Sequence, residues 1–461
     1  MDTGDTAWML ASSALVLLMT PGLAFFYGGM VRSKSVLNMI MMSFSAMGLI
    51  GVLWVLYGYS VAFGNDVGGG LLGSPGEFAG LQGTFGGTYL ETDGGPPVDI
   101  PLVGTIPATV FVAFQAMFAI ITVALISGAV ADRMKFGAWL LFAGLWATIV
   151  YFPVAHWVFS FDGVTAETGG WIANQLKAID FAGGTAVHIN AGAAALALVI
   201  VLGKRSGWPK EPMRPHNLTL VMLGAGLLWF GWFGFNAGSA VASNGIAGIT
   251  FVNTLVATSA AMLAWLVVER IRDGKPTSLG AASGVVAGLV AITPSCSSVS
   301  PLGAIAVGVI AGVLCALAVG LKFRFGYDDS LDVVGVHLVG GLVGTLLVGF
   351  FATSSAPAAV DGLFYGGGFD QLWRQAVGAF AVMIYSFVIS LVLGYLVKAV
   401  TGGGRVTAEA EAAGIDETEH AETGYDFSSH RALAGTSAAR AAATAAAAPA
   451  EQVPATAGKE A

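Results

Sequence analysis

The stretch FAGGTAVHINAG, residues 181–192, places a titratable ring, His188, in the middle of a long apolar segment. The chain around it is 56% hydrophobic and 10% charged, with a mean hydropathy of +0.77. Soluble domains have about 25% charged residues, so this composition predicts a chain that lies mostly within lipid. The 65 glycines fit that class, because small residues let transmembrane helices approach closely.

Apolar runs separated by polar breaks predict eleven membrane-spanning helices. A helix needs roughly 20 apolar residues to cross a hydrocarbon layer about 30 Å thick. The expected spans are 9–31, 36–62, 102–127, 137–159, 180–203, 218–239, 246–268, 279–294, 301–321, 332–353 and 374–398. The eighth is short, but Gly280, Gly284 and Gly288 at four-residue spacing indicate tight packing against a neighbour. We therefore expect an all-α integral membrane domain over 1–401, followed by a tail over 402–461.

The basic residues predict an orientation. Alternate short loops hold Arg32 and Lys34; Arg133 and Lys135; Lys204, Arg205, Lys210 and Arg214; Arg270, Arg272 and Lys275; and Lys322 and Arg324. The opposite loops offer only Lys177 and Arg374. By the positive-inside rule, we expect a multi-pass protein of the cell membrane with its N-terminus outside and its C-terminus in the cytoplasm. The acidic start MDTGD lacks the basic region of a signal peptide, so the first span is expected to be retained, a cleaved signal being the alternative.

Two segments stand apart from the spans. Residues 63–101 are Gly-rich and acidic, without Lys or Arg, and predict either a lid or a disordered connection. From about residue 402 the composition changes to Ala, Glu and Thr, and such a sequence cannot bury enough apolar surface to fold alone. Its charged first part, 405–427, could dock on the cytoplasmic face, whereas the part after about residue 428 is expected to be mostly disordered.

Two histidines lie deep in apolar sequence, His188 on the fifth span and His337 on the tenth. Each belongs to the last helix of a five-helix set, and an odd number of crossings per set inverts the second set relative to the first. The two rings are therefore expected to meet near the midplane. Ionisable residues at this depth are functional candidates by default. The alternative is that each is a packing histidine bonded to a backbone carbonyl or a hydroxyl.

The nearest carboxylates, Asp180 and Asp332, are expected to cap the fifth and tenth helices rather than to serve the histidines. Eight residues from Asp180 to His188 correspond to roughly 12 Å of helix. Without a close carboxylate, burial favours uncharged rings, which can share a proton. The two cysteines, Cys296 and Cys315, form neither a disulfide framework nor a metal-binding spacing, so no metal or cofactor is expected.

Five stretches together resemble the ammonium transporter family (Amt/Mep/Rh). They are TPGLAFFYGGMVRSKSVLN (20–38), AFQAMFAIITVALISGAVADRM (113–134), DFAGGTAVHINAG (180–192), GFNAGSA (234–240) and DVVGVHLVGGLVG (332–344). The resemblance covers essentially residues 5–427. It implies eleven helices arranged as an inverted five-plus-five repeat with a final helix, a homotrimer with one pore in each subunit, and transport of ammonium or methylammonium.

The resemblance also implies the residues of the site. They are His188, His337, Trp232, Phe118 and Phe235 for the pore; Phe118, Phe159, Trp171 and Ser239 for an outer recruitment site; and Asp180 as a structural acid near the mouth. Phe118 lies three residues after Gln115, and Phe235 is its expected gate partner. Many members carry a tryptophan after the pattern A-H-x-V, where AHWVFS offers Phe159 instead. Trp171 is the alternative for that position.

Physical chemistry favours the same function. Aromatic rings attract a small cation by about 0.5–2 kcal/mol each, whereas a bare charge at the midplane costs from about 2.5–3.5 to more than 10 kcal/mol. The cheaper route removes the proton, passes neutral ammonia through a hydrophobic constriction and relays the proton over the histidine pair. The sequence leaves open whether the net substrate is ammonia or ammonium. Trp54, Trp139 and Trp146 are interpreted as lipid-interface or packing residues.

Two other classes of function are alternatives to transport, a receptor and an enzyme. An ammonium-sensing receptor that signals through its tail is the main alternative, although no catalytic signalling domain follows residue 427. An enzyme would need a nucleophile, a metal cluster or a cofactor motif, and the sequence offers none. The resemblance implies a PII-type signal protein as a partner on the cytoplasmic face, but topology alone explains the basic loops equally well. Apart from the lipid bilayer, no other partner is expected, and nucleic acid is excluded.

Overall fold

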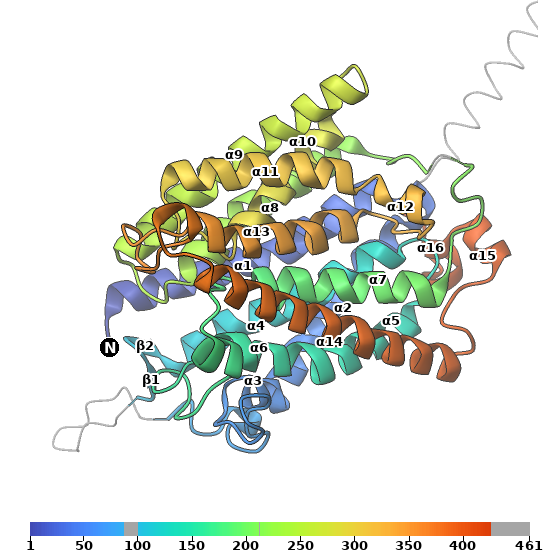
Figure 1. The fold of residues 1–461 in the computed structure, drawn as a ribbon. Helices are drawn as coiled ribbons and strands as arrows, with labels where there is room; N and C mark the ends of the chain where they lie inside the picture. Colours follow the sequence, from blue (N-terminus) through green and yellow to red (C-terminus); the bar gives the residue numbers. More distant parts are fainter. Residues whose placement is uncertain (87–99, 212, 426–461) are drawn as a thin grey trace, which may run out of the picture.

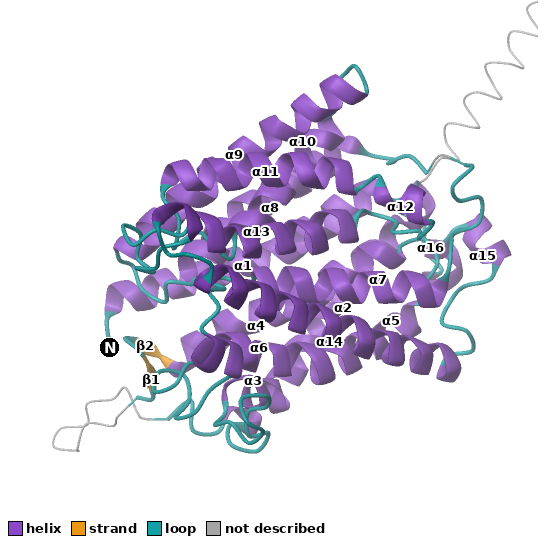
Figure 2. Ribbon diagram, in the orientation of Figure 1, coloured by secondary structure: helices purple, strands orange, loops and turns teal. Residues whose placement is uncertain are grey.

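The computed structural model describes residues 1–86, 100–211 and 213–425, and this part of the chain is mainly helical (Figure 2). Long helices lie side by side and run between two opposite faces of the molecule (Figure 1). One face carries the N-terminus and a short hairpin, and we call it the N-terminal face. The other carries α15 (Ala408–Ala413) and α16 (Ile415–His420), and we call it the tail face.

Within the described residues, ten helical segments are long and apolar enough to cross a membrane, and α10 is an eleventh, shorter apolar helix. In chain order they are α1 (Thr3–Met30), α2 (Val36–Leu53) continued by α3 (Tyr59–Phe63), α4 (Ala108–Ile126), α5 (Phe136–Trp146) continued by α6 (Phe152–Phe159), α7 (Asn190–Leu202), α8 (Leu218–Gly238), α9 (Gly245–Arg272), α10 (Ser278–Ile292), α11 (Pro301–Ala318) continued by α12 (Leu321–Phe325), α13 (Val339–Phe351) and α14 (Asp370–Val400). The prediction of eleven spans is confirmed.

Several predicted boundaries differ by a few residues, among them the start of α1 at Thr3 rather than at residue 9, and three others differ for local reasons. The third span begins at α4, because residues 102–107 form a hairpin of β1 (Leu102–Val103) and β2 (Ile106–Pro107). Gly104 makes this turn with a φ of 59°, a conformation that glycine adopts without steric cost. The fifth and tenth spans begin later than predicted, with π-helical turns η7 (Gly184–Ile189) and η8 (Val334–Leu338) that lead into α7 and α13.

The two halves of the bundle repeat each other around the two histidines. Asp180 precedes His188 by eight residues, and Asp329 precedes His337 by the same number. The third residue after each aspartate has a left-handed backbone, with a φ of 118° at Gly183 and 63° at Asp332. Each π-helical turn then continues into a helix of 13 residues. The inverted repeat is thus visible at the level of single residues.

This repeat corrects one sequence assignment. We expected Asp332 to be the counterpart of Asp180, but Asp329 occupies that position and accepts a hydrogen bond from the backbone N–H of Val334, at 2.7 Å. Asp332 instead accepts a hydrogen bond from Lys322 at 2.7 Å. The equal spacing from aspartate to histidine was present in the sequence and would have identified Asp329.

Glycines bring the two halves into contact, and they do so reciprocally. Gly192 lies four residues after His188 and packs against Leu338, the residue after His337. Gly341 lies four residues after His337 and packs against Ile189, the residue after His188. At both positions a β-carbon would press on the opposite half, at 2.5 Å from the Leu338 nitrogen and 3.0 Å from Ile189. The close approach of the two histidine-bearing segments therefore depends on these glycines.

The segments outside the bundle are partly ordered by hydrogen bonds. Residues 64–86 lie against the N-terminal face, where Trp157 donates to the carbonyl of Leu71 at 2.8 Å. On the tail face, Asp416 accepts from the backbone of Leu37 and Asn38 at the start of α2, at 3.0 and 2.8 Å. A carboxylate is favourable there, because the N-terminus of a helix carries partial positive charge. The rest of the predicted lid and tail, 87–99 and 426–461, lies outside the described residues.

Three tryptophans considered for the lipid interface are packing residues. Trp54, Trp139 and Trp146 are at most 1% exposed. Their indole N–H groups donate to the Val112 carbonyl, the Met42 carbonyl and the Ser390 hydroxyl, at 3.1, 3.0 and 2.9 Å. Each therefore joins two helices inside the bundle.

The reciprocal glycine contact predicts the outcome of adding one methyl group. Gly192→Ala should lower the free energy of unfolding by about 1–3 kcal/mol, the usual cost of overpacking, and lower the thermal midpoint of the detergent-solubilised protein. Gly51→Ala is the matched control, because a β-carbon there meets no heavy atom within 4 Å. Equal thermal midpoints for the two variants would contradict the inferred packing role of Gly192.

Candidate functional pore

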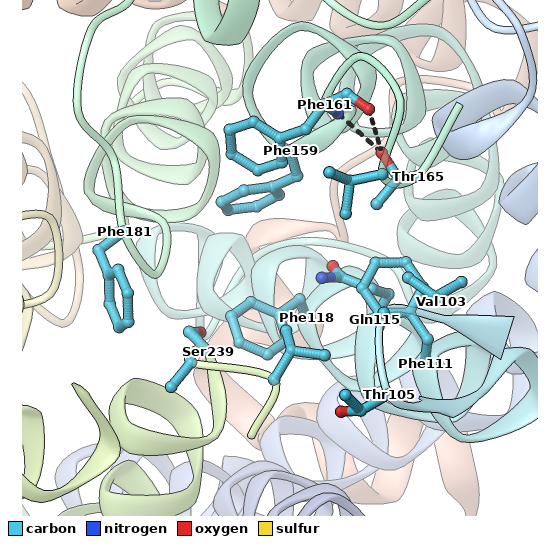
Figure 3. Close-up of a pocket in the computed structure, with 14 residues that line it drawn as sticks. Val103, Thr105, Phe111, Gln115, Phe118, Phe159, Phe161, Thr165, Phe181 and Ser239 are labelled. Carbon is cyan, nitrogen blue, oxygen red and sulfur yellow. Dashed lines mark hydrogen bonds between the residues drawn. The ribbon is translucent and has the colours of Figure 1, made fainter. Parts of the chain in front are cut away.

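A cavity of about 260 Å³ opens on the N-terminal face, and we call it the vestibule (Figure 3). Its walls come from the β1–β2 hairpin, α4, the end of α6 with the following loop, the segment before η7 and the turn after α8. The lining residues are Val103, Gly104, Thr105, Phe111, Gln115, Phe118, Phe159, Phe161, Val164, Thr165, Phe181, Ser239, Ala240 and Val241. The vestibule is therefore largely apolar and aromatic, and no Lys or Arg is among its described lining residues.

Two stacked phenylalanines separate the vestibule from the interior. The rings of Phe118 and Phe235 lie 4.2 Å apart between centroids with an interplanar angle of 22°, and they are 1% and 0% exposed. Phe159 meets Phe118 edge to face at 6.3 Å. Phe118 lines the vestibule, and Phe235 lines the space beside the histidines.

Directly beyond the phenylalanine pair lie the two histidines. His188 is 6.3 Å from Phe235 between ring centroids, stacks on Trp232 at 5.3 Å, and faces His337 at 5.3 Å with an interplanar angle of 22°. The Nδ1 atoms of the two histidines are 3.3 Å apart. The structure thus brings together five predicted pore residues from four helical segments, α4, α8, η7 and η8.

The space beside the histidines is narrow and apolar. Its volume is about 10 Å³, which is close to the minimum that holds one water molecule. Its other lining residues are Met19, Leu23, Phe26, Ile121, Leu125, Val187, Leu228, Trp232, Phe235 and Val286. A hydrated ion does not fit this space without losing its water shell.

The short contact between the two rings restricts their protonation. If both rings are neutral, one Nδ1 carries the hydrogen and the other accepts it, so the two histidines must be opposite tautomers. The Nε2 atom of His188 is buried and has no hydrogen-bond partner among the described residues. The pair therefore offers a hydrogen-bonding group toward the narrow space.

Asp180 fixes the position of His188 through the backbone. Its carboxylate accepts hydrogen bonds from four consecutive N–H groups, those of Gly183, Gly184, Thr185 and Ala186, at 2.6–3.1 Å. These are the unpaired donors at the start of a helical segment, and the π-helical turn that they begin carries His188. The N-cap residue is Gly183. Asp180 lies three residues before it and supplies the capping carboxylate that a glycine lacks.

On the tail face the corresponding aspartate lies in a cluster of charged groups. Burial, followed by the charge of Asp332, raises the pKa of Asp329 to about 6. Burial also raises the pKa of the neighbouring Asp328, but the hydrogen bonds and charge of Arg205 outweigh burial and hold it below its ordinary value. Arg205 donates to the Asp328 carboxylate at 2.8 and 2.9 Å. This end of the repeat is held by ion pairs.

The remaining recruitment candidates differ in position. Phe159 and Ser239 line the vestibule, whereas Trp171 is not among its lining residues and packs against Trp157 at 6.0 Å between ring centroids. The Ser239 hydroxyl donates to the carbonyl of Phe235 at 2.8 Å, which leaves its oxygen able to accept a hydrogen bond. Of the two aromatic candidates, Phe159 is the one at the cavity.

Three further aromatic residues of the vestibule were not anticipated, Phe111, Phe161 and Phe181. Phe111 lies four residues before Gln115 and seven before Phe118 on α4, so helical periodicity could have identified it. Phe161 follows the end of α6 in a loop, where its backbone N–H donates a hydrogen bond to the hydroxyl oxygen of Thr165 at 2.7 Å. No periodic signal marks a loop residue of this kind.

Similarity to known proteins identifies the family of this chain. A model described as the Ammonium Transporter Family matches residues 7–425. The chain belongs to this family. The transporter is 72% identical over 435 residues to an ammonium transporter of Mycobacterium tuberculosis, covering 92% of this chain and 91% of that relative. It is therefore a membrane transporter-family protein rather than an enzyme.

Solved structures show the same fold. The crystal structure of Saccharomyces cerevisiae Mep2 matches the transporter with a TM-score of 0.78 at 32% identity, over 89% of this chain and 88% of that one. A structure named Sensor Amt Protein matches with a TM-score of 0.80 at 28% identity, over 90% and 98% of the two chains. The eleven-helix fold with its inverted repeat is thus the fold of ammonium transporters.

Because the Asp180 carboxylate accepts four backbone hydrogen bonds, replacing it with an amide should destabilise the protein. Asp180→Asn replaces one carboxylate oxygen by an N–H₂ group that faces N–H donors, so it should destabilise the transporter by about 2 kcal/mol or more. Thermal unfolding in detergent measures this change. Asp332→Asn is the control, because asparagine tolerates a left-handed backbone and, among the described residues, the hydrogen-bond partner of this carboxylate is Lys322 rather than a row of backbone N–H groups. Equal stability of both variants would contradict the capping role.

Proposed function

We propose that the transporter collects ammonium in the vestibule, passes one proton of the ammonium to the histidine pair, and conducts the remaining ammonia past His188 and His337. The observation that carries this proposal is the linear order of vestibule, stacked phenylalanines and paired histidines. Each element supplies one step.

Recruitment rests on the aromatic walls and on Ser239. Phe118 and Phe159 can each attract a monovalent cation by about 0.5–2 kcal/mol, depending on desolvation. Ser239 can accept one N–H hydrogen bond from ammonium, since its own hydrogen is used on Phe235. Because no Lys or Arg is among the described lining residues of the vestibule, the cation meets no like charge from them. The site favours a small cation that is also a hydrogen-bond donor.

Conduction rests on the dryness of the path below. A charge carried through the midplane costs from about 2.5–3.5 to more than 10 kcal/mol, whereas neutral ammonia avoids that cost. Potassium is attracted to the aromatic rings equally well but has no proton to release, so the same barrier rejects it. The contact between the two imidazoles gives the released proton a route from the vestibule side of the pore to the tail face. Along this route each ring accepts a proton on one nitrogen and donates a proton from the other.

We further propose the arrangement of the transporter in the cell membrane. The basic loops gather on the tail face, which supports a cytoplasmic tail and an external vestibule by the positive-inside rule. Residues 1–401 form the transport domain and 402–461 the cytoplasmic tail. A homotrimer and a PII-type regulatory protein on the tail face follow from the family resemblance, and the exposed basic residues of that face are compatible with the second.

Flux into liposomes tests the proposal. The reconstituted protein should transport methylammonium, and His188→Asp or His337→Ala should slow uptake about tenfold or more, equivalent to about 1.4 kcal/mol in the barrier, or admit potassium. Ser259→Ala on α9 is the control, because this exposed hydroxyl bonds only to its own helix, at the carbonyl of Leu255. Normal uptake and selectivity in both histidine variants would overturn the role of the pair.

The second candidate function is ammonium sensing, which the likeness to the Sensor Amt Protein favours. A sensor would use the same vestibule to bind ammonium and would transmit occupancy through the docked tail. The liposome experiment separates the two functions, because a pure sensor binds ammonium without flux. Flux by the wild-type protein at a rate above that of empty liposomes supports transport.

A further inference from the structure

The carboxylate of Asp5, on the first turn of α1, joins two loops that form the rim of the vestibule. We infer that Asp5 is a positioning residue that holds this rim in the shape needed to bind the substrate cation. The inference rests on the transport function proposed above. Asp5 itself is not a vestibule-lining residue, so it acts through the loops that it holds.

The first loop is the turn between β1 and β2. Thr105 donates its hydroxyl hydrogen to Oδ2 of Asp5 at 2.6 Å. The same turn is held a second time, because the backbone N–H of Asp2 donates to the carbonyl of Thr105 at 2.8 Å. Val103, Gly104 and Thr105 all line the vestibule, and Figure 3 shows Thr105 and Val103 on its α4 side. The start of α1 therefore fixes one side of the rim.

The second loop is the turn from α8 to α9. Oδ1 of Asp5 accepts hydrogen bonds from the backbone N–H of Ser243 at 2.8 Å and from its hydroxyl at 3.1 Å. Two residues earlier, Val241 lines the vestibule with a φ of 53°. A β-branched residue adopts this left-handed conformation only when its surroundings impose it. The hydrogen bonds from Ser243 to Asp5 supply this constraint, because they fix the turn on the C-terminal side of Val241, while α8 fixes it on the N-terminal side.

One side chain thus bridges parts of the rim that lie more than a hundred residues apart in the sequence. The hairpin and the α8–α9 turn have no covalent reason to keep a fixed separation, and both are largely exposed at Thr105 and Ser243. Without the bridge, the rim should open and admit more water around a bound cation. Water weakens cation–π attraction, so we expect weaker binding at the vestibule with an unchanged path below it.

The test compares Asp5→Ala with Asp5→Asn in liposomes. Asp5→Ala should raise the KM for methylammonium about three- to tenfold, the size expected from losing one or two hydrogen bonds, with the maximal rate within about twofold of the wild type. Asp5→Asn keeps an oxygen for Ser243 and a polar group for Thr105, so its KM should stay near the wild-type value. Asp2→Ala is the matched control, because it removes the side-chain cap of α1 and leaves both rim contacts of Asp5.

Hydrogen exchange gives a readout that does not depend on transport. In Asp5→Ala the amides of residues 103–105 and 240–243 should exchange faster than in the wild type, while those of η7 stay unchanged. A wild-type KM in Asp5→Ala would overturn the inference. It is also overturned if Asp5→Asn raises KM as much as Asp5→Ala, because the charge rather than the bridge would then attract the cation. Absence of flux in the wild type would instead refute the proposed function, and the exchange measurement would still decide the role of Asp5.

Discussion

The contact between His188 and His337 constrains the rest of the structure. The two imidazoles lie 3.3 Å apart between Nδ1 atoms, and the segments that carry them also approach each other closely. Gly192 and Gly341 permit that approach, and the carboxylates of Asp180 and Asp329 fix the turns that aim the rings. Because the four supporting residues are related by the inverted repeat, the repeat is part of how the site is built.

The same contact gives the pore its chemistry. Paired neutral rings of opposite tautomers offer a bare nitrogen on one side of their shared bond and an N–H group on the other, while the apolar residues around them leave space for about one water molecule. The stacked phenylalanines and this narrow space exclude different competitors. In the proposed function, the phenylalanines keep water and hydrated ions in the vestibule, and the dry path rejects any cation that cannot release a proton. Selectivity in this account comes from two successive barriers rather than from one binding site.

Much of the fold could be predicted because lipid imposes simple rules on helix length and charge. The eleven spans and the placement of His188 and His337 on corresponding helices follow from apolar runs and their count. The hairpin at 102–107 was missed, since an apolar run does not distinguish a helix from a glycine turn. Asp332 was assigned as the counterpart of Asp180, whereas the equal spacing from aspartate to histidine would have indicated Asp329. Phe161 gave no periodic signal because its position depends on a loop.

Nitrogen chemical shifts of the two histidine side chains, measured by solid-state NMR in bilayers, test the central claim most directly. The account predicts uncharged rings in contact, with one protonated and one bare nitrogen in each, and no titration between about pH 5 and about pH 8, where an unperturbed histidine changes charge. It also predicts opposite tautomers for His188 and His337. An imidazolium signal at neutral pH, or the absence of any correlation between the two rings, would contradict it.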